Sequence, residues 1–273
     1  MLERCWSKLT KKARRFLVLF FNASVFLTRL PAPQWVPFNN GLLRLSAVYF
    51  PLVGVMVGFL GALMWCVLGG LFPVPLALVL TLCFCIYLTG AFHEDGWADS
   101  CDALGGGYSK EAVLKIMKDS RLGTYGVVGL LGMLAVKFLS LWVLAEQYGI
   151  LSAGLLLVVG QGLSRWFALA VMATLRYVRD DFGKSKPLAH SISFGNLVWA
   201  ACPVIVVSAW AVYSTVLTTG VMALAFLVAY GFVVYFARQL KKAIGGYTGD
   251  GLGAVQQLSE VGFYLALIAL QGV

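Results

Sequence analysis

Long apolar runs constrain this chain more strongly than any other feature of its sequence. Seven apolar runs lie at 16–27, 46–71, 76–92, 124–145, 151–175, 196–217 and 221–236, and a shorter eighth run lies at 261–273. Most of them reach the roughly 20 residues that an α-helix needs to cross a bilayer. Only 12% of the residues are charged, which is about half the share in a soluble domain, so most of the surface must face lipid. We therefore predict an all-α, polytopic integral membrane bundle with about six to eight membrane segments, in one domain over residues 1–273.

The connections between the runs alternate in charge. Those near 73, 147 and 217 are short and lack Lys and Arg, whereas the N-terminus, 93–123, 176–195 and 237–259 are longer, polar and basic. This alternation is the positive-inside pattern of a cell inner membrane protein. It predicts that the basic connections, which hold the chemically interesting residues, face the cytoplasm. It also accounts for the net charge of +9 without any binding of nucleic acid.

The first 30 residues lack the pattern of a cleaved signal peptide. Six Lys and Arg side chains precede the run at 16–27, but Asn22 interrupts that run and no small-residue cleavage pattern follows it. We predict a basic amphipathic start over 3–29 that leads into a short or re-entrant helix at the membrane face.

The segment 92–126 holds six of the twelve acidic residues, although it lies between two apolar runs. Glu94, Asp95, Asp99 and Asp102 fall within nine positions, and on a helix the three aspartates would project from one face. A solvated loop would explain carboxylates at a membrane edge, but not four of them so close together without a Lys or Arg. Carboxylates at this spacing suit Mg²⁺, which completes its shell with water and phosphate oxygens. The segment therefore predicts a magnesium site for a phosphate-bearing substrate.

A second polar segment, KDSRLGTYG at 118–126, precedes the next apolar run. Lys118 and Arg121 suit phosphate oxygens, and Ser120 and Thr124 add hydroxyl donors. The alternative is that the two cations only anchor the topology. The mixture of acid, hydroxyl and base beside the acidic segment, Asp119 included, favours a substrate-binding role.

Two further connections contribute candidates. The loop RYVRDDFGKSKPLAH at 176–190 carries Arg179 and Lys184, which would clamp phosphates or a nucleotide unless the loop only sets topology. The glycine-rich GGYTGDGLG at 245–253 surrounds Thr248 and Asp250. Glycine lets a backbone approach a phosphate closely, and Asp250 would supply another metal ligand.

Ionisable residues also lie inside the apolar runs. Lys137 is in the middle of one run, and Arg165 follows Gln161 and Ser164 in another. An ionisable residue within a membrane is a functional candidate by default, so Arg165 joins the substrate-binding candidates. Membership of a purely structural ion pair is the alternative for both cations.

Three motifs then point to one family. HEDGWADSCDALGG at 93–106, IMKDSRLGTYG at 116–126 and GGYTGDGLGA at 245–254 resemble the motifs of the cobalamin synthase family, the adenosylcobinamide-GDP ribazoletransferases. TRLPAP at 28–33 is similar to the N-terminal signature of that family, and the likeness extends over nearly the whole chain. A few uncharged positions depart from the family pattern, namely Trp97, Ser100, Cys101 and Gly251.

The resemblance implies a Mg²⁺-dependent transferase that joins adenosylcobinamide-GDP to α-ribazole or its 5′-phosphate and releases GMP. The expected partners are these substrates and membrane lipid, and homo-oligomerisation stays open. The catalytic and metal-binding residues implied are Glu94, Asp95, Asp99 and Asp102. Glu94 is either a further ligand or the base, and Asp250 would hold a second metal ion or the incoming ribose. The identity of the base stays open.

Two other interpretations fit parts of the pattern. Residues 95–98 echo a CDP-alcohol phosphotransferase motif, but Asp99 stands where those enzymes have Arg. Prenyltransferases carry two acidic clusters, whereas the second cluster here is only Asp250 with Glu260. A transporter would place its polar residues at mid-depth between broken helices, whereas here they concentrate at one membrane face.

Overall fold

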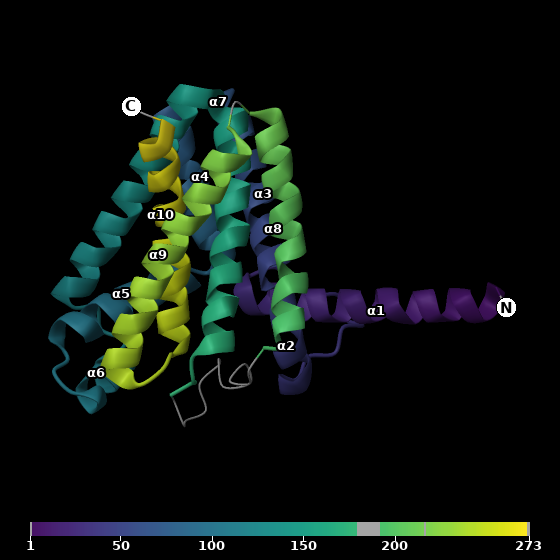
Figure 1. The fold of residues 1–273 in the computed structure, drawn as a ribbon, viewed down its shortest axis with the longest axis horizontal. Coiled ribbons are helices and arrows are strands. Elements are labelled where there is room, and N and C mark those ends of the chain that lie inside the picture. Colours follow the sequence, from purple (N-terminus) through teal and green to yellow (C-terminus); the bar gives the residue numbers. More distant parts are fainter. Residues whose placement is uncertain (1, 179–191, 216, 272–273) are drawn as a thin grey trace.

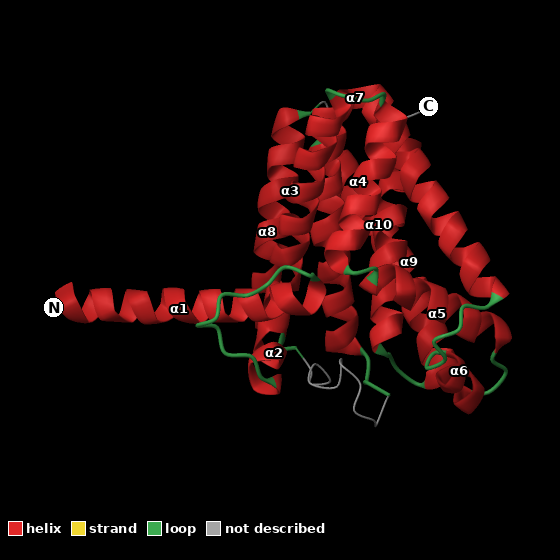
Figure 2. Cartoon of the chain, turned by 180° about the vertical axis from the view of Figure 1, so that it is seen from behind, coloured by secondary structure: helices red, strands yellow, loops and turns green. Residues whose placement is uncertain are grey.

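The computed structural model describes residues 2–178, 192–215 and 217–271, and these residues form an all-α bundle, which confirms the predicted fold class (Figures 1 and 2). A single 3-10 turn at Ala47–Tyr49 joins the second helix to the third. The helices are α1 (Leu2–Leu27), α2 (Asn40–Ser46), α3 (Phe50–Gly69), α4 (Val74–Thr89), α5 (Phe92–Gly106), α6 (Lys110–Ile116), α7 (Thr124–Thr174), α8 (Phe194–Ser214), α9 (Thr219–Ile244) and α10 (Gly249–Gln271).

Several of these helices are suited to crossing a membrane. Within the described residues, five helical stretches are long and apolar enough, and α4 with α5 forms a sixth candidate that is bent by 89°. The 51 residues of α7 correspond to about 77 Å, far more than one crossing requires. Its backbone breaks at Gly149, where φ is 79°, and the second half runs back through the middle of the bundle (Figure 1). The element α7 thus consists of two helices that supply two passes, joined at the turn predicted near 147.

The charged and uncharged connections lie at opposite ends of the bundle. The turns between α3 and α4, within α7 and between α8 and α9 share the end at which the chain terminus of α10 lies (Figure 1). The acidic α5, the short α6 and the turn between α9 and α10 lie at the other end, with α2 (Figures 1 and 2). The predicted gathering of the polar connections on one side is therefore confirmed for the connections that the structure describes.

The N-terminal helix α1 lies across the bundle, almost at right angles to the spans (Figures 1 and 2). Its apolar side is buried at Leu19, Ala23 and Leu27, whereas the basic residues 11–15 are exposed. This is the amphipathic start that the sequence predicts, but α1 is one straight 26-residue helix rather than a short or re-entrant one.

The last apolar run is longer than the sequence indicates. We expected a short segment at 261–273, whereas α10 begins at Gly249 and spans 23 residues. Gln256, Gln257 and Glu260 lower the hydropathy of its first half, but all three are buried inside the bundle and not exposed to lipid. The helix α10 therefore forms the centre of the fold, where it packs against α5, α7 and α9.

Candidate active site

The acidic helix α5 turns sharply away from the span that precedes it. Gly90 and Ala91 both adopt left-handed backbone angles, with φ of 68° and 57°, and they end α4 and start α5 at the angle of 89°. The helical prediction for the acidic segment is confirmed. On α5, Asp95 is exposed and Asp99 is half-buried, and because they are four residues apart their side chains are neighbours on the helix surface.

The start of α10 packs directly against this acidic helix. A Cβ atom placed on Gly96 would lie 2.7 Å from the backbone oxygen of Asp250 and 3.2 Å from the Cα of Gly253. Only glycine permits so close an approach of two helix backbones. The contact brings Asp250 beside the helix that carries Asp95 and Asp99, although about 150 residues separate them in the sequence.

Asp102 has a defined structural partner. One carboxylate oxygen accepts the backbone N–H of Gly123 at 2.7 Å and the other accepts that of Gly126 at 2.8 Å. These are N–H groups of the first turn of α7, which have no partner within their own helix. Asp102 therefore caps α7 from a neighbouring helix. Its role as a metal ligand stays a prediction, and a metal ion would have to share carboxylate oxygens that already accept these hydrogen bonds.

Glu94 points into the bundle, away from the face that carries the aspartates. Its side chain is buried, and Oε1 accepts a hydrogen bond from Nε2 of Gln257 on α10 at 2.7 Å. Oε1 of Gln257 in turn accepts from Nζ of Lys137 at 2.6 Å. These contacts connect α5 to the middle of a membrane span. The predicted roles of Glu94 as metal ligand or base stay predictions beside this structural one.

Glu260 is the centre of the buried polar network to which Glu94 belongs. Its Oε2 lies 3.3 Å from Nζ of Lys137 and accepts from Nε2 of Gln256 at 2.7 Å. Its Oε1 accepts from Nε2 of Gln161 at 2.8 Å and from the hydroxyl of Tyr264 at 3.1 Å. Each oxygen of this buried carboxylate thus has two polar partners, as burial of a charge requires.

Arg165 completes the network from the second half of α7. It is buried, and its guanidinium donates to the backbone oxygen and to Oε1 of Gln161 at 2.9 and 2.7 Å. With Lys137, Glu94 and Glu260, the network holds two positive and two negative side chains. The expectation that an intramembrane cation pairs with an acid is confirmed for Lys137, while the predicted substrate contact of Arg165 stays a prediction.

A cavity of about 20 Å³ lies inside the network. Three buried atoms at its walls have no hydrogen-bond partner, namely Oε2 of Glu94, Nε of Arg165 and Oε1 of Gln256. A polar cavity above about 15 Å³ with two to four polar partners is large enough for an ordered water.

The connection between α6 and α7 carries the second set of candidates. Arg121 and Asp119 form a two-pronged ion pair in which the shortest N–O distance is 2.6 Å. The hydrogen bonds from Arg121 lower the pKa of Asp119 to about 2. Arg121, Lys118, Ser120 and Thr124 are all exposed at the same end of the bundle as α5, where a soluble substrate can reach them.

Thr248 holds this connection against α10. Its hydroxyl is buried, accepts the backbone N–H of Gly251 at 3.1 Å, and donates to Sδ of Met117 at 3.6 Å. Thr248 is therefore the cap of α10. Its predicted substrate contact stays a prediction, and the hydroxyl already has both a donor and an acceptor partner.

The basic loop starts beside the same turn. Tyr247 donates its backbone N–H to the oxygen of Arg176 at 2.9 Å, and its own oxygen accepts from Val178 at 3.1 Å. This parallel bridge, between Tyr177 and Tyr247, places the loop after α7 next to α10. The predicted phosphate ligands Arg179 and Lys184 lie outside the described residues.

The donor set on α5 fits a magnesium ion that is bound together with its substrate. Among the described residues, no group of three or more His, Cys, Asp and Glu side chains lies close enough to hold a metal ion. Mg²⁺ is commonly bound by one or two carboxylates while substrate phosphates and water supply the other oxygens. Asp95 and Asp99, one turn apart with Asp250 nearby, provide such an incomplete oxygen set.

Comparison with known proteins agrees with the motifs. The model of the family described as cobalamin-5-phosphate synthase matches residues 19–268. An adenosylcobinamide-GDP ribazoletransferase of Leptothrix cholodnii is 40% identical over 256 residues, which cover 92% of this chain and 95% of that protein. The enzyme of the same name from Vibrio parahaemolyticus is 42% identical over 268 residues, covering 96% and 97%. No solved structure matches the chain.

Proposed function

Because this chain belongs to the cobalamin-5-phosphate synthase family, we propose that it joins adenosylcobinamide-GDP to α-ribazole or α-ribazole 5′-phosphate and releases GMP. The observation that carries this function is identity of 40% or more to ribazoletransferases over more than nine tenths of the chain. The protein is a transferase of the last step of nucleotide-loop assembly in cobalamin biosynthesis. Its helices form one membrane-embedded catalytic domain.

The reaction is a substitution at phosphorus. A hydroxyl oxygen of the ribazole ribose forms a bond to the phosphorus on the cobinamide side, the bond from that phosphorus to the oxygen of GMP breaks, and the hydroxyl proton passes to a base. Negative charge spreads over the phosphoryl oxygens in the transition state. The protein therefore accelerates the step mainly by holding two large substrates in line and by neutralising this charge.

We assign Asp95 and Asp99 to a magnesium ion on the pyrophosphate, with Asp250 as a further oxygen ligand or as a partner of the ribose. When bound, the ion would neutralise charge on the phosphate oxygens and orient the leaving group. The two α5 carboxylates are the exposed and half-exposed acids at the polar end of the bundle, where a nucleotide can reach them. Asp102 supports them, since it attaches α5 to the start of α7.

The cations beside this acidic face complete the charge balance. Lys118 and Arg121 lie in the connection that Thr248 attaches to the start of α10. Arg121 is 87% exposed, so a phosphate can replace water around its guanidinium while Asp119 fixes its position. Guanidinium groups match phosphate geometry with two parallel hydrogen bonds. We assign to Lys118 and Arg121 the binding of the phosphate that leaves as GMP.

The orientation follows from the charge pattern. The basic connections and the acidic helix occupy one end of the bundle, and Lys and Arg retain loops on the cytoplasmic side. We propose that the protein lies in the cell inner membrane with its active site facing the cytoplasm.

The test is a direct assay of the purified protein in detergent with adenosylcobinamide-GDP, α-ribazole and Mg²⁺. The wild type and a Glu111→Ala control, which removes an exposed acid from α6, should release GMP at equal rates. Asp99→Ala should lower the rate at least about 100-fold, as loss of a metal ligand does, and chelation by EDTA should abolish it reversibly. A folded wild type without product would overturn the function. Equal rates for Asp99→Ala and wild type would keep the enzyme and move the metal site.

A further inference from the structure

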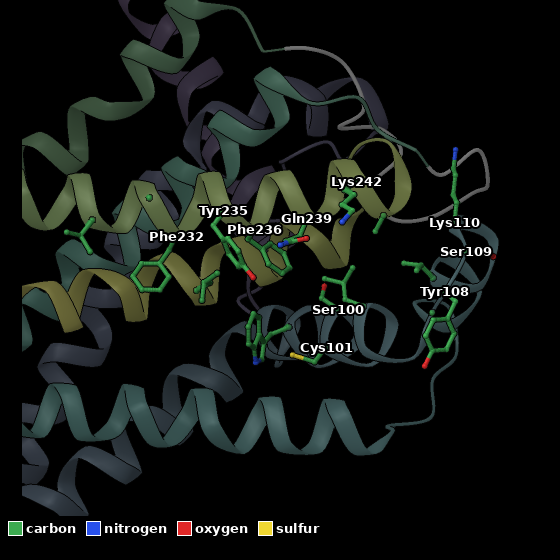
Figure 3. A pocket seen from close by; sticks show the side chains of 18 residues that line it. Ser100, Cys101, Tyr108, Ser109, Lys110, Phe232, Tyr235, Phe236, Gln239 and Lys242 are labelled. Atoms are coloured by element: carbon green, nitrogen blue, oxygen red, sulfur yellow. The ribbon is translucent and has the colours of Figure 1, made fainter.

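A large cavity lies beneath α5, on the side away from the aspartates. Its volume is about 1230 Å³, and α5, α6 and α9 form its walls, with Leu258 of α10 among the residues that line it. Figure 3 shows Phe232, Tyr235 and Phe236 of α9 facing Ser100 and Cys101 of α5 across this space.

Helical geometry separates this cavity from the acidic face. The lining residues Trp97, Cys101 and Leu104 each stand two positions after one of the aspartates at 95, 99 and 102. Two positions correspond to roughly 200° around an α-helix. The same helix therefore presents carboxylates on one side and the cavity on the other.

The cavity extends from membrane depth to the polar end of the bundle. Its lining on α9 begins at Val228 and ends at Ala243, a rise of about 22 Å, which is more than half of the roughly 30 Å hydrocarbon core. Over most of this length the walls are apolar. Cationic and amide groups gather only at the end, where Lys242 and Gln239 of α9 lie close together and the side chain of Lys110 on α6 points outward (Figure 3).

We propose that this cavity is a binding site for one phospholipid, with an acyl chain along α9 and the phosphate beside Lys242. This apolar space within one leaflet, which ends near cationic side chains at the polar end of the bundle, complements the charge and shape of a phospholipid. It does not complement a fully polar ligand. A nucleotide substrate would have to place its sugar and phosphates among Val228, Phe232 and Phe236, where burial of unpaired polar groups is costly.

The lipid has a mechanical consequence for the acidic helix. Trp97 closes one side of the cavity, since its Nε1 donates to the backbone oxygen of Gly129 on α7 at 2.9 Å and its ring lies 6.1 Å from that of Phe236. An acyl chain packed below Trp97 and Leu104 supports α5 from the membrane side. Removal of the lipid exposes the parts of Trp97 and Leu104 that line the cavity.

Glycine positions allow the site to be filled without disturbing the fold. Gly231 lines the cavity, and a Cβ atom placed there meets no atom within 4 Å. Gly132 of α7 is equally open but does not line the cavity. The variant Gly231→Phe therefore occupies the proposed chain site, and Gly132→Phe is its matched control. Lys242→Ala with Lys241→Ala as control tests the phosphate contact in the same way.

The experiment measures phosphatidylglycerol that stays bound after the full-length protein is moved from phosphatidylglycerol nanodiscs into detergent and washed, by mass spectrometry of the intact complex. About one lipid per chain should stay with the wild type and both controls, and at least about five-fold less with Gly231→Phe and Lys242→Ala. Equal retention in Gly231→Phe and Gly132→Phe would overturn the proposal. So would a Gly231→Phe variant that keeps its lipid but has a raised KM for α-ribazole, because the cavity would then be a substrate site. Because lipid retention is measured without turnover, its outcome is independent of the proposed function.

Discussion

Removal of the buried cation at position 137 should destabilise the bundle strongly. Nζ of Lys137 lies 3.3 Å from Oε2 of Glu260 and donates to Gln257 at 2.6 Å, and both charged side chains are buried. The variant Lys137→Met keeps the length and most of the volume of the side chain. What it removes is the positive charge, so that Glu260 is left inside the bundle without its ion-pair partner.

The size of the loss follows from the charge that is left unpaired. Two unit charges at this separation attract each other by about 5 kcal/mol at an effective dielectric constant of about 20. We expect the free energy of unfolding to fall by about 3–5 kcal/mol, the range for removing one partner of a buried ion pair.

The assay is reversible unfolding of the detergent-solubilised protein by increasing mole fractions of SDS. The double variant Lys137→Met with Glu260→Gln should recover most of the stability, since no unpaired charge remains. A loss below about 1 kcal/mol, or a double variant no more stable than Lys137→Met, would refute this account of the network.

Three further predictions concern the polar end of the bundle. Asp102→Ala should lower the free energy of unfolding by about 2 kcal/mol in the same assay, because it removes a charged acceptor from the first turn of α7. If Asp102 acted only as a metal ligand, the variant would be as stable as the wild type. Burial raises the pKa of Tyr247 to about 12, so its contribution to stability is complete below pH 10 and falls as the pH rises from 10 to 12. The variant Tyr247→Phe should not show this fall in stability when thermal unfolding is measured as a function of pH. Arg121→Ala should raise KM for adenosylcobinamide-GDP about ten-fold or more. The free energy of unfolding should stay within about 0.5 kcal/mol of the wild type, since the Asp119–Arg121 pair is exposed. An unchanged KM would exclude the phosphate contact.

The general architecture could be predicted from the sequence because lipid imposes strict rules on composition. Apolar runs of helical length and the alternation of basic and uncharged connections predicted the spans, their number and their shared polar end. The prediction was wrong at α10, where a hydropathy argument treats every polar side chain as exposed. Gln256, Gln257 and Glu260 instead form hydrogen bonds with one another and with α7, so the helix that carries them can be the most buried of the spans.

Side-chain direction could not be predicted from local spacing alone. Glu94 and Asp95 are adjacent in the sequence, yet Glu94 is bound to Gln257 inside the bundle and Asp95 is exposed. Asp102 has the helical spacing of a third metal ligand, but its oxygens cap α7. Each outcome depends on a partner more than 20 residues away, which no local pattern specifies. The sequence predicted Asp250 as a metal ligand, but not its contact with α5 at Gly96.

The buried charges and the acidic helix belong to one mechanical unit. A helix that leaves its span at 89° is not held in place by that span, so its position depends on its contacts with α7 and α10. Glu94 supplies one from the start of α5, through Gln257 to the Lys137–Glu260 pair, and Asp102 supplies another from its far half. Between these two anchors stand Asp95 and Asp99. A transfer reaction loses much of its rate when reacting groups shift by about 1 Å. The buried charged network costs desolvation energy, but it fixes the position of Asp95 and Asp99, and this accounts for charges buried so deep in the bundle.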